Sequence, residues 1–254
     1  MSIELHAVAD IPDIKPGDEL AKYIVDGLCA ADLVINSTDI LVIAHKIISK
    51  AEGQMINLAE IRPSETARQL GEKTAKDPRK VEVILRESQK VLKIREATDH
   101  NEGLIITRHR LGFVSANAAI DESNVGESGD VILLPVDPDH SARQLREKLF
   151  QLTGQAPGIV ISDTFGRPWR LGQVNVAIGL AGVPALTDLT ETCDAWGRKL
   201  TVTKPAIADE LAAASGLLMA KSTKTPVIVF RGVDWSPSDT CIQDLLRPTQ
   251  EDLF

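Results

Sequence analysis

The chain has 254 residues, of which 43% are hydrophobic and 25% charged; these values are typical of a folded globular chain and exclude global disorder. We expect a single region over residues 1–254, built as one large domain or as two interwoven subdomains that share a core. The 28 Lys and Arg residues are outnumbered by 36 Asp and Glu residues, so the formal net charge is −8. This charge argues against binding to nucleic acid or to an anionic membrane, but it allows a small anionic substrate where basic side chains gather locally.

Three features predict the cellular compartment. The N-terminus has no basic flank followed by an apolar core, so we expect no signal peptide. The longest apolar runs, such as Ile40–Ala44, are far shorter than the roughly 20 residues of a membrane-spanning helix. The three cysteines, Cys29, Cys193 and Cys241, are an odd number without C-x-x-C spacing, which predicts buried reduced thiols rather than a disulfide or a zinc site. We therefore expect a cytoplasmic protein.

Short apolar runs alternate with amphipathic segments along the chain. The apolar runs predict strands buried on both faces at Ile40–Ala44, Gly103–Thr107, Val131–Leu134, Gly158–Ser162 and Pro226–Phe230. Apolar residues three and four apart predict helices at Asp18–Leu33, Pro63–Thr74, Ser141–Leu152 and Pro205–Ala220. We expect a solvated helix over the charged segment Arg79–Arg95. The mixture predicts a layered α/β or mixed α+β fold, and the chain lacks the glycine motifs of P-loop and Rossmann proteins.

The first segment that can carry chemistry is Ile40–Gly53, ILVIAHKIISKAEG. Its apolar strand leads directly into His45, Lys46, Ser49 and Lys50. Cations and a hydroxyl at the end of a buried strand suit a phosphate site, because ligands bind at strand ends in α/β folds. The alternative is a strand that simply leaves the core into the polar start of a helix.

The second segment is Gly112–Gly126, GFVSANAAIDESNVG, in which small residues precede Asp121, Glu122, Ser123 and Asn124. The Asp121 carboxylate and the Asn124 amide are three residues apart and can both face one hard cation, since Mg²⁺ and Mn²⁺ prefer oxygen ligands. An Asx turn or a helix N-cap explains the same residues equally well.

The third segment is Pro157–Pro184, PGIVISDTFGRPWRLGQVNVAIGLAGVP. We expect its strand to end at Asp163-Thr164, where a carboxylate beside a hydroxyl can coordinate a divalent ion. Arg167 and Arg170 are assigned a catalytic role, because guanidinium groups clamp carboxylate or phosphate oxygens bidentately. Trp169 can stack on a flat ring or anchor the loop. The alternative for the whole stretch is an ordinary strand–turn–helix.

Five segments together carry a family resemblance. They are IPDIKPGDEL (Ile11–Leu20), SKAEG (Ser49–Gly53), VSANAAIDESNV (Val114–Val125), SDTFGRPWRLGQ (Ser162–Gln173) and DAWGRKL with PAIADELAAA (Asp194–Ala214). In these segments, which follow one another almost from end to end, the chain resembles the coenzyme F-420-0:L-glutamate ligase family. The combination of SDTFGRPWR with ANAAIDESNV is highly specific.

The resemblance implies a GTP-dependent ligase that adds L-glutamate to the lactyl carboxylate of coenzyme F-420-0, and then through a γ-linkage to F-420-1, by way of an acyl phosphate. It implies Mg²⁺ or Mn²⁺ and a monovalent cation, K⁺, as cofactors. It also implies a family-specific fold with a mixed sheet and flanking helices, and a homodimer whose other partners are small molecules. Two alternatives stay open: another metal- and nucleotide-dependent carboxylate-activating enzyme, and a non-catalytic nucleotide- or deazaflavin-binding protein.

Transferred position by position, the resemblance implies metal ligands at Asp121, Asp163 and Thr164. It implies nucleotide contacts at Ile11, Pro12, Asp13, Ile14, His45, Lys46, Lys50, Asn124, Met219, Ala220, Lys221 and Ser222. The chain departs from the family pattern at Ala220-Lys221, where a small residue followed by Gln is expected. A charged lysine cannot ligate a metal, so we expect Lys221 to contact phosphate and water to fill the ligand position. Because the sequence ends at Phe254, we expect no flavin-binding C-terminal extension of the kind found on some relatives.

Overall fold

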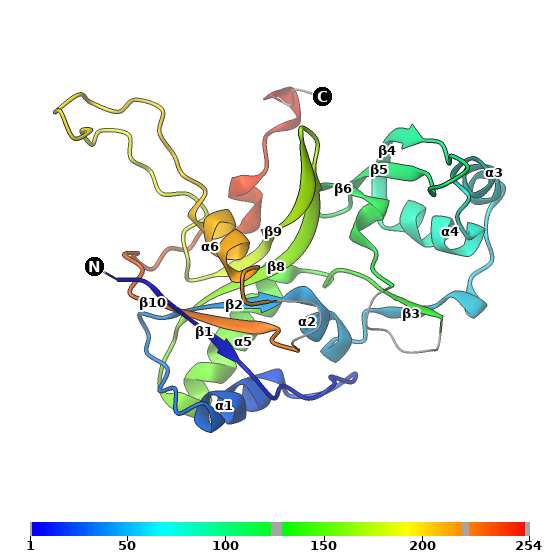
Figure 1. Cartoon of the computed structure of the whole chain (residues 1–254). Helices are drawn as coiled ribbons and strands as arrows, with labels where there is room; N and C mark the ends of the chain where they lie inside the picture. Colours follow the sequence, from blue (N-terminus) through cyan, green and yellow to red (C-terminus); the bar gives the residue numbers. More distant parts are fainter. Residues whose placement is uncertain (1, 123–128, 220–223, 252–254) are drawn as a thin grey trace.

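The computed structural model describes residues 2–122, 129–219 and 224–251, and a five-stranded sheet lies at its centre (Figure 1). The strand order is β1 (Glu4–Val8), β10 (Val227–Arg231), β2 (Ile40–Ala44), β8 (Gly158–Arg167) and β9 (Arg170–Ala181). β2 and β8 run parallel, whereas the other neighbouring strands are antiparallel. This mixed sheet with flanking helices confirms the predicted mixed α/β fold class.

Helices cover both faces of the main sheet. α1 (Leu20–Ala30) and α5 (Pro138–Thr153) lie on one face, and α6 (Ile207–Ser215) lies on the other (Figure 1). Because both faces are covered, nearly every side chain of β2, β10 and the first half of β8 is buried, as predicted. α5 begins before the predicted Ser141, because the Asp137 side chain caps its first turn and Pro138 suits its first position.

The chain leaves the main sheet after β2 and α2 (His45–Ala51), builds a smaller layer, and returns in α5 (Figure 1). β4 (Ser88–Arg95), β5 (Leu104–His109) and β6 (Val114–Ala116) form a three-stranded sheet, which carries α3 (Glu65–Thr74) and α4 (Pro78–Arg86). β3 (Met55–Asn57) pairs with β7 (Asp130–Ile132). Single 3-10 turns lie at Leu58–Glu60, Asn117–Ala119, Ile242–Leu245 and Thr249–Glu251. This layer has an apolar cluster of its own, formed by Ala67, Val81, Ile84, Ile105 and Ala118.

The prediction of one helix over Arg79–Arg95 is wrong in its second half. α4 ends at Arg86, and Ser88–Arg95 is the strand β4. The pairing of β4 with β5 has two register shifts, and the better-buried side chains of β4 are consequently Ser88, Val91 and Ile94. A spacing of three residues imitates a helical pattern, whereas a regular strand would show a spacing of two.

Two other predicted elements differ from the structure. β5 is not buried on both faces: Ile105, Thr107 and His109 are buried, and the residues between them are half-buried. Such alternation is typical of an antiparallel sheet that has helices on one face. α6 ends at Ser215, where Gly216 follows, and is therefore shorter than the predicted Pro205–Ala220.

The three cysteines are free, in agreement with the absence of a predicted disulfide, but they are not buried thiols. Cys29 and Cys193 are exposed and Cys241 is partly exposed. None of the described helices is long and apolar enough to cross a membrane.

Candidate active site

The parallel pair β2–β8 brings two of the predicted segments together at one edge of the main sheet. Ala44, the last residue of β2, is in register with Ser162 of β8. The chain then enters α2 at His45, whereas β8 continues beside β9 as far as Arg167. Beyond Ser162, β8 has lost β2 as its neighbour, and its next residues line a cavity of about 830 Å³. That volume is typical of a small-molecule pocket.

Most of the predicted site residues line this cavity. They are Ile11, Pro12, Asp13, Ile14, Lys46, Lys50, Asp121, Asp163, Thr164 and Met219. They come from the loop before α1, from α2, from the segment after β6, from β8 and from the segment after α6. Asn124, Ala220, Lys221 and Ser222 lie outside the described residues.

His45 lies beside Asp163 and does not line the cavity. Its side chain is 2% exposed, and its Nδ1 lies 3.2 Å from Ser49 Oγ, one turn further along α2. Its Nε2 lies 3.3 Å from Asp163 Oδ1, a close contact that lacks hydrogen-bond geometry. Asp163 Oδ1 also accepts a hydrogen bond of 2.6 Å from the backbone N–H of Thr164. The structure thus places His45 as a neighbour of a predicted metal ligand rather than as a lining residue.

Lysines and carboxylates share the cavity. Lys46 Nζ lies 2.6 Å from Asp121 Oδ2, and both side chains are largely buried, at 19% and 27% exposure. Lys50, in the last turn of α2, lines the cavity, and within the described part of the chain no ion pair joins it to a carboxylate. Lys224, which was not predicted from the sequence, adds a third lysine to the lining. The cavity can therefore hold anionic groups although the chain as a whole is acidic.

The segment that leads to Asp121 has an unusual backbone. Asn117, Ala118 and Ala119 all have positive φ, at 51°, 51° and 54°. A left-handed conformation costs roughly 1–2 kcal/mol for each residue other than glycine, and such strain is concentrated at functional sites. Asn117 Oδ1 accepts a hydrogen bond from Ile105 N of β5, which ties this turn to the smaller sheet. Asn117 and Ala119 line the cavity, so the turn forms part of its wall.

Asn175 of β9 was also not predicted, although it lines the cavity opposite Thr164. The two residues are in register, and Thr164 Oγ1 donates a hydrogen bond of 2.8 Å to Asn175 Oδ1. α6 is fixed to the same strand, because the Asp209 carboxylate accepts a hydrogen bond of 2.9 Å from Ala177 N. Burial raises the pKa of Asp209, and this hydrogen bond opposes the increase.

Arg167 and Arg170 do not line the cavity. They face each other at the exposed tip of the β8–β9 hairpin, and Arg167 Nη2 donates to Leu171 O at 2.8 Å. The prediction that the strand ends at Asp163-Thr164 is wrong, because β8 continues to Arg167. At a rise of about 3.3 Å per residue, Arg167 lies roughly 13 Å along the strand from Asp163. Trp169 at the same tip is 77% exposed and is therefore not a buried anchor.

The donor set in the cavity fits a hard divalent cation. Asp121, Asp163 and Thr164 supply carboxylate and hydroxyl oxygens, which are the ligands that Mg²⁺ and Mn²⁺ prefer. Within residues 2–122, 129–219 and 224–251, no cluster of three His, Cys, Asp or Glu side chains could hold a metal by itself. The residues therefore suit an ion that completes its coordination with phosphate oxygens and water, as Mg²⁺ commonly does.

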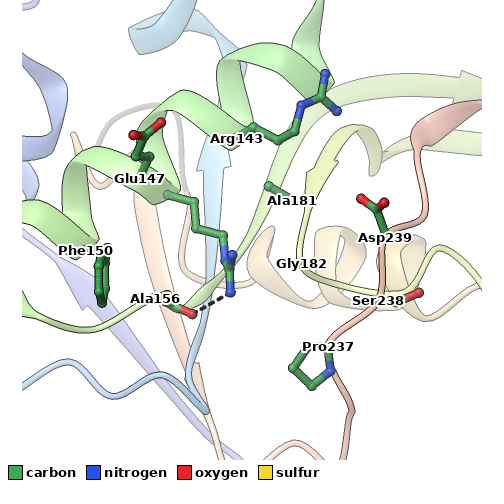
Figure 2. Close-up of a pocket in the computed structure, with 10 residues that line it drawn as sticks. Arg143, Glu147, Phe150, Ala156, Ala181, Gly182, Pro237, Ser238 and Asp239 are labelled. Carbon is green, nitrogen blue, oxygen red and sulfur yellow. Dashed lines mark hydrogen bonds between the residues drawn. The ribbon is translucent and has the colours of Figure 1, made fainter.

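A second cavity, of about 610 Å³, lies between α5 and residues 237–239 (Figure 2). It contains none of the predicted site residues. Arg146 in its wall donates to the carbonyl oxygens of Pro157 and Ala156, at 2.9 and 3.1 Å, and so ties the middle of α5 to the residues just before β8. This cavity is set apart from the carboxylates and lysines described above.

A mixed sheet whose parallel strands end at a pocket of lysines and carboxylates defines an α/β protein with a small-molecule pocket lined by charged groups. The chain belongs to the family described as "F420-0:Gamma-glutamyl ligase", whose model matches residues 9–232. This match confirms the resemblance found in the sequence.

Curated proteins from archaea show the same relationship. The chain is 47% identical over 221 residues to "Coenzyme F420:L-glutamate ligase" of Methanopyrus kandleri, covering 87% of this chain and 83% of that protein. It is 42% identical to the protein of the same name from Methanothermobacter thermautotrophicus, covering 100% and 99% of the two chains. It is 41% identical to that of Methanocaldococcus jannaschii, covering 96% and 94%.

Proposed function

We propose that the protein is a GTP-dependent ligase that joins L-glutamate to the lactyl carboxylate of coenzyme F-420-0, and then to F-420-1 through a γ-linkage. The observation that carries the proposal is the cavity at the ends of β2 and β8, in which Lys46, Lys50, Asp121, Asp163 and Thr164 meet. The family membership and the names of the relatives support coenzyme F-420 and L-glutamate as substrates.

The reaction must activate a carboxylate before an amine can attack it. A carboxylate oxygen of F-420-0 attacks the γ-phosphorus of GTP, and GDP leaves. The amino group of glutamate then attacks the acyl carbon of the acyl phosphate, loses a proton, and displaces phosphate. The two steps together form one amide bond and produce one GDP and one phosphate. No covalent bond to the protein is needed, and none of the three cysteines lines the cavity.

The side chains act through charge and position. Lys46, Lys50 and Lys224 are placed to neutralise phosphate oxygens, and positioning together with electrostatic stabilisation supplies most of the catalysis of phosphoryl transfer. Asp121, Asp163 and Thr164 would hold Mg²⁺ or Mn²⁺, which would neutralise charge on the triphosphate, and K⁺ is proposed as an additional cation. Because Asp121 is paired with Lys46, the lysine and a divalent ion would compete for this carboxylate.

We also propose that the protein is a homodimer. Large apolar side chains are exposed on two projecting segments, the β8–β9 hairpin with Trp169 and Leu171, and the arm between β9 and α6 with Trp196 and Val202. Figure 1 shows the arm extending far from the sheet. Association with a second copy would remove these apolar side chains from water.

Replacing Lys50 with Ala is expected to weaken GTP binding by about 10-fold or more. The ammonium group lines the cavity, and a hydrogen bond to a charged group contributes about 1.5–3 kcal/mol. Isothermal titration calorimetry with GTP in the presence of Mg²⁺ measures the change in GTP affinity. Lys22→Ala is the matched control, since Lys22 is exposed on α1 and away from the cavity. Equal GTP affinity in Lys50→Ala and the wild type would assign Lys50 to the polar surface of α2 instead.

The proposed function is tested by mass spectrometry of the deazaflavin product. With GTP, Mg²⁺ or Mn²⁺, L-glutamate and F-420-0, we expect a product that is heavier by one glutamyl residue, with GDP and phosphate formed in equal amounts. Replacing GTP with ATP should abolish most of the product, and leaving out glutamate should abolish all of it. Addition of glutamate without a nucleotide, or no product with either metal, would contradict the proposal.

A further inference from the structure

Asn175 makes contacts that go beyond those of an ordinary strand residue. Its Oδ1 accepts the hydrogen bond from Thr164 Oγ1, at 2.8 Å. Its Nδ2 donates to Ser215 Oγ, at 3.4 Å, and lies 3.9 Å from Met219 Sδ. Ser215 is fully buried at the end of α6, and its hydroxyl donates to Ala212 O. The amide is therefore held from both sides, by the strand and by the helix.

The direction of the hydrogen bond determines what Thr164 can offer to a ligand. A hydroxyl group has one proton to donate and two lone pairs. Because the proton of Thr164 Oγ1 is directed to Asn175, the lone pairs remain for other partners. An oxygen that presents lone pairs suits a cation, whereas a hydroxyl free to turn its proton into the cavity would oppose one.

We propose that Asn175 is a positioning residue for the divalent cation: it orients the Thr164 hydroxyl so that its oxygen can coordinate the ion. This inference rests on the proposed function, because Thr164 is a metal ligand there. The inference adds Asn175 as a residue that holds the proposed metal ligand Thr164 in place without touching the cation itself. Outer-shell partners of this kind typically change metal affinity by about 10- to 100-fold when they are removed.

The test measures Mn²⁺ binding, with and without GDP, from the electron paramagnetic resonance signal of the unbound ion. Asn175→Ala should weaken Mn²⁺ binding by about 10-fold or more. The Mn²⁺ affinity of Asn175→Asp should be within about 2-fold of that of the wild type, since a carboxylate accepts the same hydrogen bond from Thr164. Asn101→Ala is the matched control and should bind Mn²⁺ as the wild type does, because Asn101 is exposed and lies outside the cavity lining.

A double variant separates positioning from a general effect on folding. If Asn175 acts through Thr164, Asn175→Ala combined with Thr164→Val should bind Mn²⁺ as weakly as Thr164→Val alone, and no more weakly. The inference is overturned if the two losses multiply, if Asn175→Ala binds Mn²⁺ normally, or if the wild type binds no Mn²⁺. The ligation assay is run on the same wild-type protein. Whether it forms the glutamylated product tests the proposed function independently of the Mn²⁺ measurements.

Discussion

Asp163→Asn is expected to lower the ligation rate by at least about 10²–10³-fold, the loss typical of removing one group that stabilises charge in a transition state. The Asp163 carboxylate lines the cavity, lies 3.3 Å from the buried His45 and accepts the Thr164 N–H. Asn keeps the size of the side chain and can still accept that hydrogen bond, but it removes the negative charge that a divalent cation requires. The measurement is the rate of product formation at limiting and at saturating Mg²⁺.

The free energy of unfolding should change little in this variant, by no more than about 1–2 kcal/mol, as for an ordinary point substitution. Asp26→Asn is the matched control, because Asp26 is exposed on α1 and outside the cavity lining. It should leave both the rate and the stability unchanged. Wild-type turnover of Asp163→Asn at limiting Mg²⁺ would show that Asp163 is not a metal ligand.

Arg231→Met is expected to destabilise the fold by about 3 kcal/mol, the lower end of the range for breaking a buried ion pair, because Asp39 is buried whereas Arg231 is 33% exposed. Arg231 ends β10, and its Nε and Nη2 donate to the two oxygens of Asp39 at 3.0 and 2.7 Å. The Asp39 side chain is only 1% exposed, so its charge would lose its partner without gaining water. The hydrogen bond to Asp39 also raises the pKa of the Arg231 guanidinium. Urea unfolding measures the change.

The chain offers a matched control in Arg79→Met. Arg79 pairs with Asp77 through similar contacts, but neither side chain is buried, at 46% and 35% exposure, whereas Asp39 is 1% exposed. Exposed pairs contribute roughly 0–1 kcal/mol, so this variant should unfold nearly as the wild type does. A similar loss of unfolding free energy in the two variants would show that burial of Asp39 does not determine how much the Asp39–Arg231 pair stabilises the fold.

Three of the five strands of the main sheet could be predicted from sequence because their signals are local, whereas β1 and β9 were not predicted. Ile40–Ala44, Gly158–Ser162 and Pro226–Phe230 are continuous apolar runs, as expected for strands covered on both faces. The helices α1, α3 and α5 have a clear apolar stripe, and the predictions for them are confirmed apart from their terminal residues. β4 was missed because its irregular pairing with β5 hides the alternation of a strand.

The predicted site residues come together in the cavity most clearly where a residue directly follows a buried strand. Lys46 and Lys50 follow β2. Asp163 directly follows Ser162, the residue of β8 that pairs with Ala44 at the end of β2. Arg167 and Arg170 have the appropriate chemistry, but the length of the β8–β9 hairpin places them at its tip. The position of the two arginines follows from the pairing of β8 with β9 beyond Ser162. No local sequence pattern predicts how far that pairing extends. Their catalytic role stays a prediction.

Asn175, Lys224 and the left-handed turn at Asn117–Ala119 were not predicted, for a different reason. Asn175 becomes part of the site through its register with Thr164, and Lys224 through the return of the chain to β10. Ala118 and Ala119 adopt positive φ without any glycine to indicate it. Each of these features depends on tertiary contacts that a single sequence does not display.

If GTP activates the carboxylate of F-420-0 as an acyl phosphate, as proposed, an oxygen isotope must pass from that carboxylate to the released phosphate. F-420-0 labelled with ¹⁸O in both oxygens of the lactyl carboxylate is converted with GTP, Mg²⁺ and L-glutamate, and the released phosphate is analysed by mass spectrometry. Because the attacking carboxylate oxygen stays on phosphorus when the amine displaces phosphate, each F-420-0 molecule that is glutamylated should release one phosphate with one ¹⁸O atom. A second addition activates the unlabelled γ-carboxylate of F-420-1 and releases unlabelled phosphate. Conversion of F-420-0 to F-420-1 without ¹⁸O-labelled phosphate would contradict the proposed mechanism.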